Sequence, residues 1–157
     1  MDLEARPEIF QLTLKALADH PWIGTGLGTF TTVFEAYRTP DLLFFVNAAH
    51  NDYLENMLEL GIPAALLLFG SVLALFVMCV RGAIRRRRDA ILPCVGVGVT
   101  ALVAMHSLVD FSMQIPAVTV TYLMLLGAAV AQSIPSGARV HPDDTRAFSA
   151  EVDSGSA

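Results

Sequence analysis

The sequence lacks the short motifs that mark the commonest catalytic and metal sites. Its four histidines are scattered, neither HExxH nor CxxC occurs, and no serine stands in a G-x-S-x-G context. Neither metal catalysis nor serine hydrolysis is therefore predicted. The glycine-rich run at 24–28 lacks the Lys and Ser/Thr of a phosphate-binding P-loop, which makes a tight glycine turn the better interpretation. No bound metal and no cofactor is expected.

Charge is scarce as well. Charged residues make up 16% of the 157-residue chain, hydrophobic residues make up 54%, and the mean hydropathy is +0.56. Three runs carry no charged residue: 60–80, 90–109 and 115–134. Each has about 20 residues and can cross about 30 Å of hydrocarbon as a helix, whereas a soluble domain of this size can rarely bury three wholly apolar helices. We therefore predict an all-α, multi-pass membrane protein with three spans.

Positive charge is concentrated between the first two predicted spans, at Arg81 and Arg85–Arg88. Arginine-rich short loops stay in the cytoplasm, and an Arg at the bilayer centre costs on the order of 2.5–3.5 kcal/mol. A nucleic-acid patch is the competing and less favoured interpretation. Alternation then divides the chain into an extracytoplasmic helical segment (1–59), a membrane domain (60–134) and a cytoplasmic tail (135–157) whose composition predicts disorder.

The N-terminus does not explain how residues 1–59 reach the outside. Met1–Arg6 is acidic and lacks the apolar core of a signal peptide, and no uncharged run of span length precedes Leu60. We therefore expect the sequence to be the C-terminal part of a longer polytopic protein, or of a split reading frame.

Three short helices are predicted within residues 1–59. Pro7 suits a first helical position, and apolar residues then recur at helical spacing up to Asp19. These residues are Ile9, Phe10, Leu14 and Leu17. A second helix is predicted at 29–37. Asn51 or Asp52 can cap a third helix that continues to Leu60, where Gly61 and Pro63 start the first span.

The order of several motifs is more informative than any one of them. Arg6 leads the first helix, residues 19–30 read D-x-P-W-I-G-x-G-x-G-x-F, residues 49–55 read A-H-N-x-Y-L-E, and S-L-V-D-F follows at 107–111. This order resembles the C-terminal portion of the O-antigen ligase and polymerase family, whose members are polytopic glycosyltransferases that use polyprenyl-diphosphate-linked sugars. Family members have further spans before this region, so the resemblance implies that this segment does not work alone.

The resemblance also implies roles for particular residues. His50 corresponds to the essential loop histidine of the family, and Arg6 corresponds to an arginine that engages the carrier diphosphate. Arg38, Tyr53 and Asp110 are predicted to contact substrate. The expected partners are a polyprenyl diphosphate-linked glycan donor, a lipid, glycan or protein acceptor, and membrane lipids. The expected location is the bacterial inner membrane, the chemistry is metal-independent, and no nucleic acid is involved.

Elementary chemistry is compatible with these roles. An imidazole can take a proton from an acceptor hydroxyl near neutral pH, and a guanidinium forks onto phosphate oxygens. The alternative for His50 is a helix cap or a loop hydrogen bond. His106 precedes Asp110 by one helical turn, so the two side chains can meet as a structural pair instead of contacting substrate. The alternative function is a membrane transporter of small anions, or a structural subunit.

Overall fold

The computed structural model describes residues 6–40, 46–86 and 90–134. Every regular element in this part of the chain is helical. In chain order the elements are α1 (Arg6–Asp19), α2 (Phe30–Tyr37), α3 (Asp52–Leu60), α4 (Ile62–Arg85), α5 (Ile91–His106), the 3-10 turn η2 (Ser112–Gln114) and α6 (Pro116–Ser133). The predicted all-α fold is confirmed. The predicted disordered tail, Arg87 and Arg88 lie outside the described residues.

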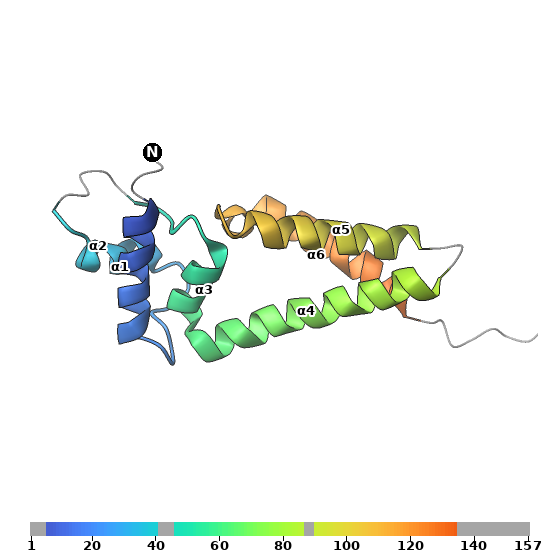
Figure 1. Cartoon of the computed structure of the whole chain (residues 1–157), viewed down its shortest axis with the longest axis horizontal. Helices are drawn as coiled ribbons and strands as arrows, with labels where there is room; N and C mark the ends of the chain where they lie inside the picture. Colours follow the sequence, from blue (N-terminus) through green and yellow to red (C-terminus); the bar gives the residue numbers. More distant parts are fainter. Residues whose placement is uncertain (1–5, 41–45, 87–89, 135–157) are drawn as a thin grey trace, which may run out of the picture.

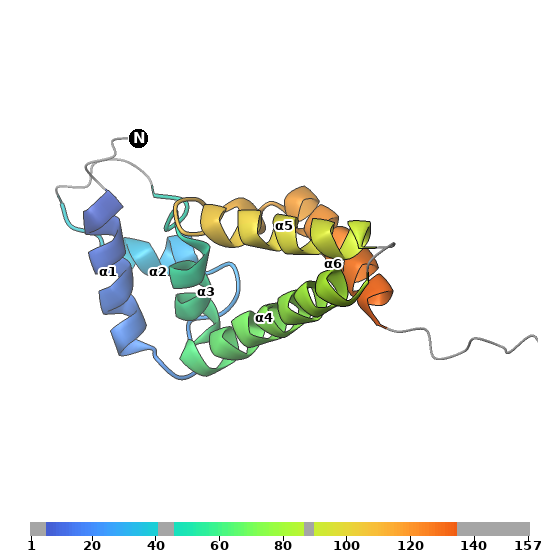
Figure 2. The same cartoon turned by 45° about the vertical axis from the view of Figure 1, so that its right-hand side comes forward.

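The helices form two groups (Figure 1). The short helices α1, α2 and α3 pack around one apolar cluster that includes Ile9, Phe34 and Leu58. The long helices α4, α5 and α6 extend away from that group side by side, and a second cluster lies among them around Cys79 and Leu126. Helix α1 runs across the direction of the long helices in both views (Figures 1 and 2).

The three short helices begin and end close to where local signals predict. Asn51 is the N-cap of α3, because its side-chain oxygen accepts a hydrogen bond from the Leu54 N–H at 3.0 Å. The predicted apolar face of α1 is partly wrong, since Leu14 is exposed and Thr13 is buried. The Thr13 hydroxyl donates to the Ile9 carbonyl at 2.7 Å. Because this hydrogen bond lies within α1, the small Thr13 side chain can be buried in the core without another polar partner.

Two of the three predicted spans form helices long and apolar enough to cross a membrane, α4 and α6. Helix α4 continues to Arg85, so Arg81 lies within the helix and not in the loop where we predicted it. Helix α5 has 16 residues, a length of about 24 Å against the ~30 Å of a bilayer core. It ends at His106, and the Ser107 carbonyl that follows accepts a hydrogen bond from the first residue of α3, as described below.

The long helices are held together by small residues near the arginine-bearing end of α4. A Cβ at Gly82 would lie 2.4 Å from Ser133 Oγ, and a Cβ at Gly96 would lie 2.5 Å from the Cβ of Ala129. Such contacts let helix backbones approach closely, as in membrane helix pairs. From this end α4 diverges from α5 and α6 toward α3 (Figures 1 and 2). The arginines and the group α1–α3 therefore lie at opposite ends of the long helices.

Candidate active site

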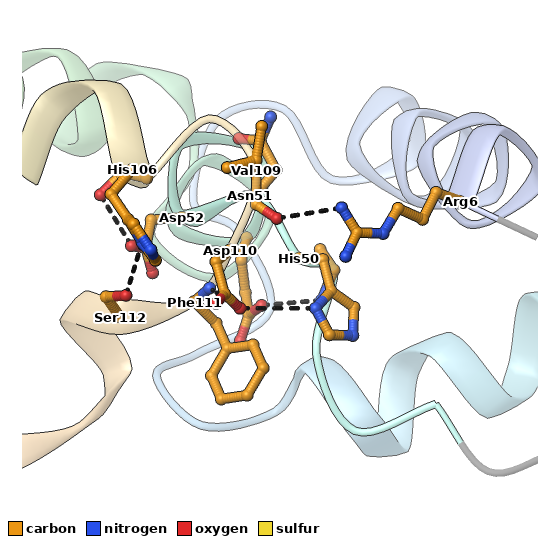
Figure 3. A network of polar contacts seen from close by, with 12 residues as sticks. Arg6, His50, Asn51, Asp52, His106, Val109, Asp110, Phe111 and Ser112 are labelled. Atoms are coloured by element: carbon orange, nitrogen blue, oxygen red, sulfur yellow. Dashed lines mark hydrogen bonds and ion pairs between the residues drawn. The ribbon is translucent and has the colours of Figure 1, made fainter. Parts of the chain in front are cut away.

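The candidate site forms where the start of α3 meets the chain just after α5. The Asp52 N–H donates to the Ser107 carbonyl at 2.9 Å, and the Ser107 hydroxyl donates back to Asp52 Oδ2 at 2.8 Å. The side-chain amide of Asn51 donates to the Leu108 carbonyl at 3.2 Å. Residues 107–109 thus form a loop bound to α3, which places Asp110 beside His50 (Figure 3).

Asp52 makes most of the hydrogen bonds that hold this junction together. Its Oδ2 also accepts a hydrogen bond from the Met113 N–H at 3.2 Å, and the residue is buried. Burial raises the pKa of Asp52, while the bonds from Ser107 and Met113 lower it and the nearby Asp110 raises it. Because its bonds connect α3 to the segments on both sides of Asp110, Asp52 has a structural role in holding the site.

His50 has a backbone conformation that is uncommon for residues other than glycine. Its φ is +52°, in the left-handed region, which costs a residue with a Cβ about 1–2 kcal/mol. The residues on both sides are fixed: the Ala49 N–H donates to Glu55 Oε2 at 2.9 Å, and Asn51 caps α3. Backbone strain of this kind is typical of functional sites, where the surroundings hold it in place.

The His50 ring faces a carboxylate and is shielded from water. Nδ1 lies 3.6 Å from Asp110 Oδ1, the edge of the ring packs against Phe111, and the residue is 8% exposed. Neither ring nitrogen has a hydrogen-bond partner among the described residues. A buried polar atom without a partner costs free energy, so His50 is poised to gain from a hydroxyl that reaches Nε2.

Asp110 supplies negative charge to the ring. The Phe111 N–H donates to its Oδ1 at 2.9 Å, and this bond lowers the pKa of Asp110, with the His50 and His106 rings acting in the same direction. Asp110 is therefore ionised near neutral pH. A carboxylate near one imidazole nitrogen favours a proton there by its charge, which leaves the lone pair on the other nitrogen.

Arg6, the first residue of α1, reaches the same loop. Its guanidinium donates to the Val109 carbonyl at 3.3 Å, so Arg6 and His50 contact consecutive residues, 109 and 110 (Figure 3). A guanidinium has five N–H donors, and within the described residues Arg6 makes this one hydrogen bond. The remaining donors are available to an anion beside His50.

The suggested pairing of His106 with Asp110 is wrong. The Nδ1 of His106 is hydrogen bonded to the Ser112 hydroxyl at 2.7 Å, and the carboxylate of Asp110 pairs with His50. The Asp110 N–H still donates to the His106 carbonyl at 3.1 Å, but each side chain has another partner. His106 is exposed at the rim of the site.

The other two predicted substrate contacts are placed differently. Tyr53 donates its hydroxyl to the Ala104 carbonyl at 2.9 Å, and its ring packs edge-on against Phe69 of α4. Tyr53 therefore connects α3 to both α4 and α5. Arg38 follows the last residue of α2 and is exposed. Contact of either residue with substrate remains a prediction.

Comparison with known proteins agrees with the motif order. The family model described as O-antigen ligase matches residues 1–69, which include Arg6, the glycine turn and the block around His50. The match covers 69 of the 157 residues and shows that this segment is similar to the O-antigen ligase family. The family resemblance inferred from the motifs is confirmed over this segment. No curated protein matches the chain.

Members of the O-antigen ligase family are membrane-embedded, glycosyltransferase-like ligases that act on lipid-linked glycans. The family match ends within α4, so Asp110 lies outside it and joins the site only through the fold. In the described residues, no group of three or more His, Cys, Asp or Glu side chains could hold a metal ion.

Two buried acids of helix α3 support the site, and sequence reasoning gave them no role. Glu55 accepts a hydrogen bond from the residue before His50, and Glu59 Oε1 accepts one from the Phe30 N–H at 3.0 Å at the start of α2. Both side chains are buried. The available signal was two acids four residues apart on a short helix surrounded by apolar residues, since buried acids need partners.

Glu55 makes the stability of the group α1–α3 depend on pH. Burial raises its pKa from 4.5 to about 7, with the Ala49 N–H opposing and the Glu59 and Asp52 carboxylates adding to the rise. Between these values the folded state holds a proton that the unfolded state has released, so stability falls as pH rises. We expect Glu55→Gln to raise the thermal midpoint relative to wild type more at about pH 8 than at about pH 5. An equal difference at both pH values would contradict the assignment.

Proposed function

We propose that this chain forms part of a membrane glycosyltransferase that moves a saccharide chain from a polyprenyl diphosphate carrier to an acceptor hydroxyl. The acceptor hydroxyl belongs to a lipid, a sugar or a protein. The observation that carries the proposal is the pairing of a strained, buried His50 with the ionised Asp110, next to the guanidinium of Arg6. The family match over residues 1–69 supports the class of reaction.

In the proposed reaction His50 is the general base. The negative charge of Asp110, 3.6 Å from Nδ1, favours a proton on that nitrogen, so the lone pair on Nε2 accepts the proton of the acceptor hydroxyl. The acceptor oxygen forms a bond to the anomeric carbon while the bond from that carbon to the carrier phosphate breaks. The diphosphate leaves with the electron pair, and Arg6 neutralises the charge that develops on it. The Asp110 carboxylate stabilises the imidazolium that results.

The acceptor has no open path to Nε2 of His50 in this structure. Both nitrogens of His50 are shielded from solvent, and Phe111 packs against the ring. An acceptor can reach Nε2 only when neighbouring side chains move apart. A site that stays closed until the acceptor binds would keep water away from the base. This would prevent hydrolysis of the donor, a side reaction that a transferase must avoid.

The proposed topology has three spans, with the site outside the cytoplasm. Helices α4 and α6 are long enough to cross, and the shorter α5 crosses beside them, with the loop 107–111 that binds α3 at the outer boundary of the bilayer. The described arginines of the cluster, Arg81, Arg85 and Arg86, lie at the opposite end of α4 from α3. The positive-inside rule then places α1–α3 and His50 on the outer face of the inner membrane.

The proposal is tested by Asp110→Asn in the intact protein, supplied with a defined lipid-linked glycan and acceptor. The neutral amide keeps the size of the side chain and loses the charge that stabilises the imidazolium. We expect kcat to fall about tenfold or more, since tenfold corresponds to ~1.4 kcal/mol of transition-state stabilisation. Asp19→Asn, at an exposed position at the end of α1, is the matched control and should transfer normally.

Normal transfer by Asp110→Asn would remove the carboxylate from the reaction. Absence of transfer by the wild type under all donor conditions, together with uptake of a small anion into vesicles, would contradict the proposal and favour the transport alternative.

A further inference from the structure

We propose that the glycine turn between α1 and α2 is a membrane anchor that inserts into the outer leaflet beside the start of α4. The surface consists of Trp22, Ile23 and Leu27, which are 77%, 87% and 73% exposed. The inference rests on α4 crossing the bilayer, as in the proposed function.

The composition of the turn suits a lipid surface. No Asp, Glu, Lys or Arg occurs from His20 to Phe34. Three large apolar side chains exposed together in a short uncharged segment are costly in water. Tryptophan in particular is enriched at the level of the lipid headgroups, where its ring is buried in the interface and its N–H remains hydrated.

The turn is fixed at the boundary where the span begins. The Ile62 N–H donates to the Pro21 carbonyl at 2.8 Å, and the N–H groups of Thr25 and Gly26 donate to the carbonyls of Leu58 and Glu59 at 3.0 and 2.9 Å. The turn is therefore bound to the last turn of α3 and the first residue of α4.

Two glycines allow this close contact. A Cβ at Gly24 would lie 2.4 Å from both the Glu59 carbonyl oxygen and the Gly61 nitrogen, and a Cβ at Gly61 would lie 2.5 Å from the Trp22 carbonyl oxygen. Both residues also have positive φ, +72° and +78°. The height of the turn relative to α4 is thus set by backbone contacts, and its apolar side chains continue the lipid-exposed surface that begins at Ile62.

The anchor has a consequence for the site. The same helix, α3, binds the glycine turn at its C-terminal end and carries His50 directly before its N-terminal end. Insertion of the turn would therefore fix how far His50 lies from the bilayer surface. The diphosphate of a membrane-embedded carrier lies at that surface, so the anchor would hold His50 near the diphosphate.

Trp22 is the only tryptophan of the chain, so its fluorescence reports on this surface alone. The full chain is reconstituted in phosphatidylethanolamine and phosphatidylglycerol vesicles, and flotation establishes that it is in the membrane. We expect blue-shifted emission, strong quenching by lipids brominated near the headgroup end of the acyl chain, weaker quenching by bromine near the chain terminus, and little quenching by aqueous acrylamide.

A matched control moves the reporter to the exposed face of α1. In the double variant Trp22→Phe, Gln11→Trp, the indole lies on the side of α1 opposite its buried residues Ile9 and Thr13, and should be quenched by acrylamide and not by brominated lipid.

Two outcomes would overturn the anchor. Red-shifted emission of Trp22 with strong acrylamide quenching would place the turn in water. Blue-shifted emission that neither quencher affects would mean that protein covers it, from a second copy or from another polypeptide. Because the readout needs no glycan transfer, its failure is distinct from a failure of the proposed reaction.

Discussion

Replacing His50 with asparagine is expected to lower kcat for glycan transfer by about 10²- to 10⁴-fold, the contribution of a positioned general base. Asparagine tolerates the left-handed φ of +52° that His50 adopts, so the turn into α3 should survive. It has no lone pair basic enough to take the proton of a hydroxyl. The loss should therefore be in kcat, with the amount of protein in the membrane unchanged.

The control for this experiment is the same substitution at His20, an exposed residue between α1 and the glycine turn. His20→Asn should leave transfer intact. A third variant, His50→Gly, relieves the backbone strain and removes the base, and it should be as inactive as the asparagine variant. Retained activity in either His50 variant would assign this residue a purely structural role.

Two substitutions of Arg6 are expected to distinguish the contribution of its positive charge to glycan transfer from that of its planar guanidinium. Arg6→Lys keeps the positive charge and loses the planar fork that matches two phosphate oxygens, so transfer should fall about tenfold. Arg6→Ala loses both, and a hydrogen-bonded charge is worth about 1.5–3 kcal/mol, so a fall of about 10- to 150-fold is expected. The measurement is transfer from a defined lipid-linked glycan by the intact protein.

The structure supplies an alternative role for Arg6 that the same variants test. Its bond to the Val109 carbonyl connects α1 to the loop that carries Asp110. If that tether is its whole role, both variants should lower the thermal midpoint by similar amounts and leave KM for the lipid-linked donor unchanged. Arg81→Lys, exposed near the opposite end of α4, is the matched control and should change neither quantity.

The short helices could be predicted because their signals are local. Pro7 and the apolar spacing that follows mark α1, and the side chain of Asn51 bonds within its own first helical turn. Gly61, with φ of +78°, allows the chain to change direction between α3 and α4. Each of these effects acts between residues at most a few positions apart, which a sequence pattern records directly.

The predictions that failed depended on distant contacts. Leu14 was expected on the buried face of α1, but the buried face includes Thr13, whose hydroxyl donates to a carbonyl of its own helix. The extent of the second span remains a prediction, but helix α5 ends at His106, and the carbonyls of Ser107, Leu108 and Val109 accept hydrogen bonds from Asp52, Asn51 and Arg6. No pattern within residues 100–110 records those donors.

The sequence alone determined the apolar runs, the arginine cluster between them and the motif order of the O-antigen ligase family, because these depend on residue type and spacing. Only the tertiary structure decided that Asp110, and not a residue near it in sequence, lies beside His50, and that Arg6 reaches the adjacent peptide. The physical reason is that the first contact joins two side chains 60 positions apart, which only the fold brings together. The second joins a guanidinium to a backbone carbonyl 103 positions away, and every residue has such a carbonyl, so no sequence pattern marks it.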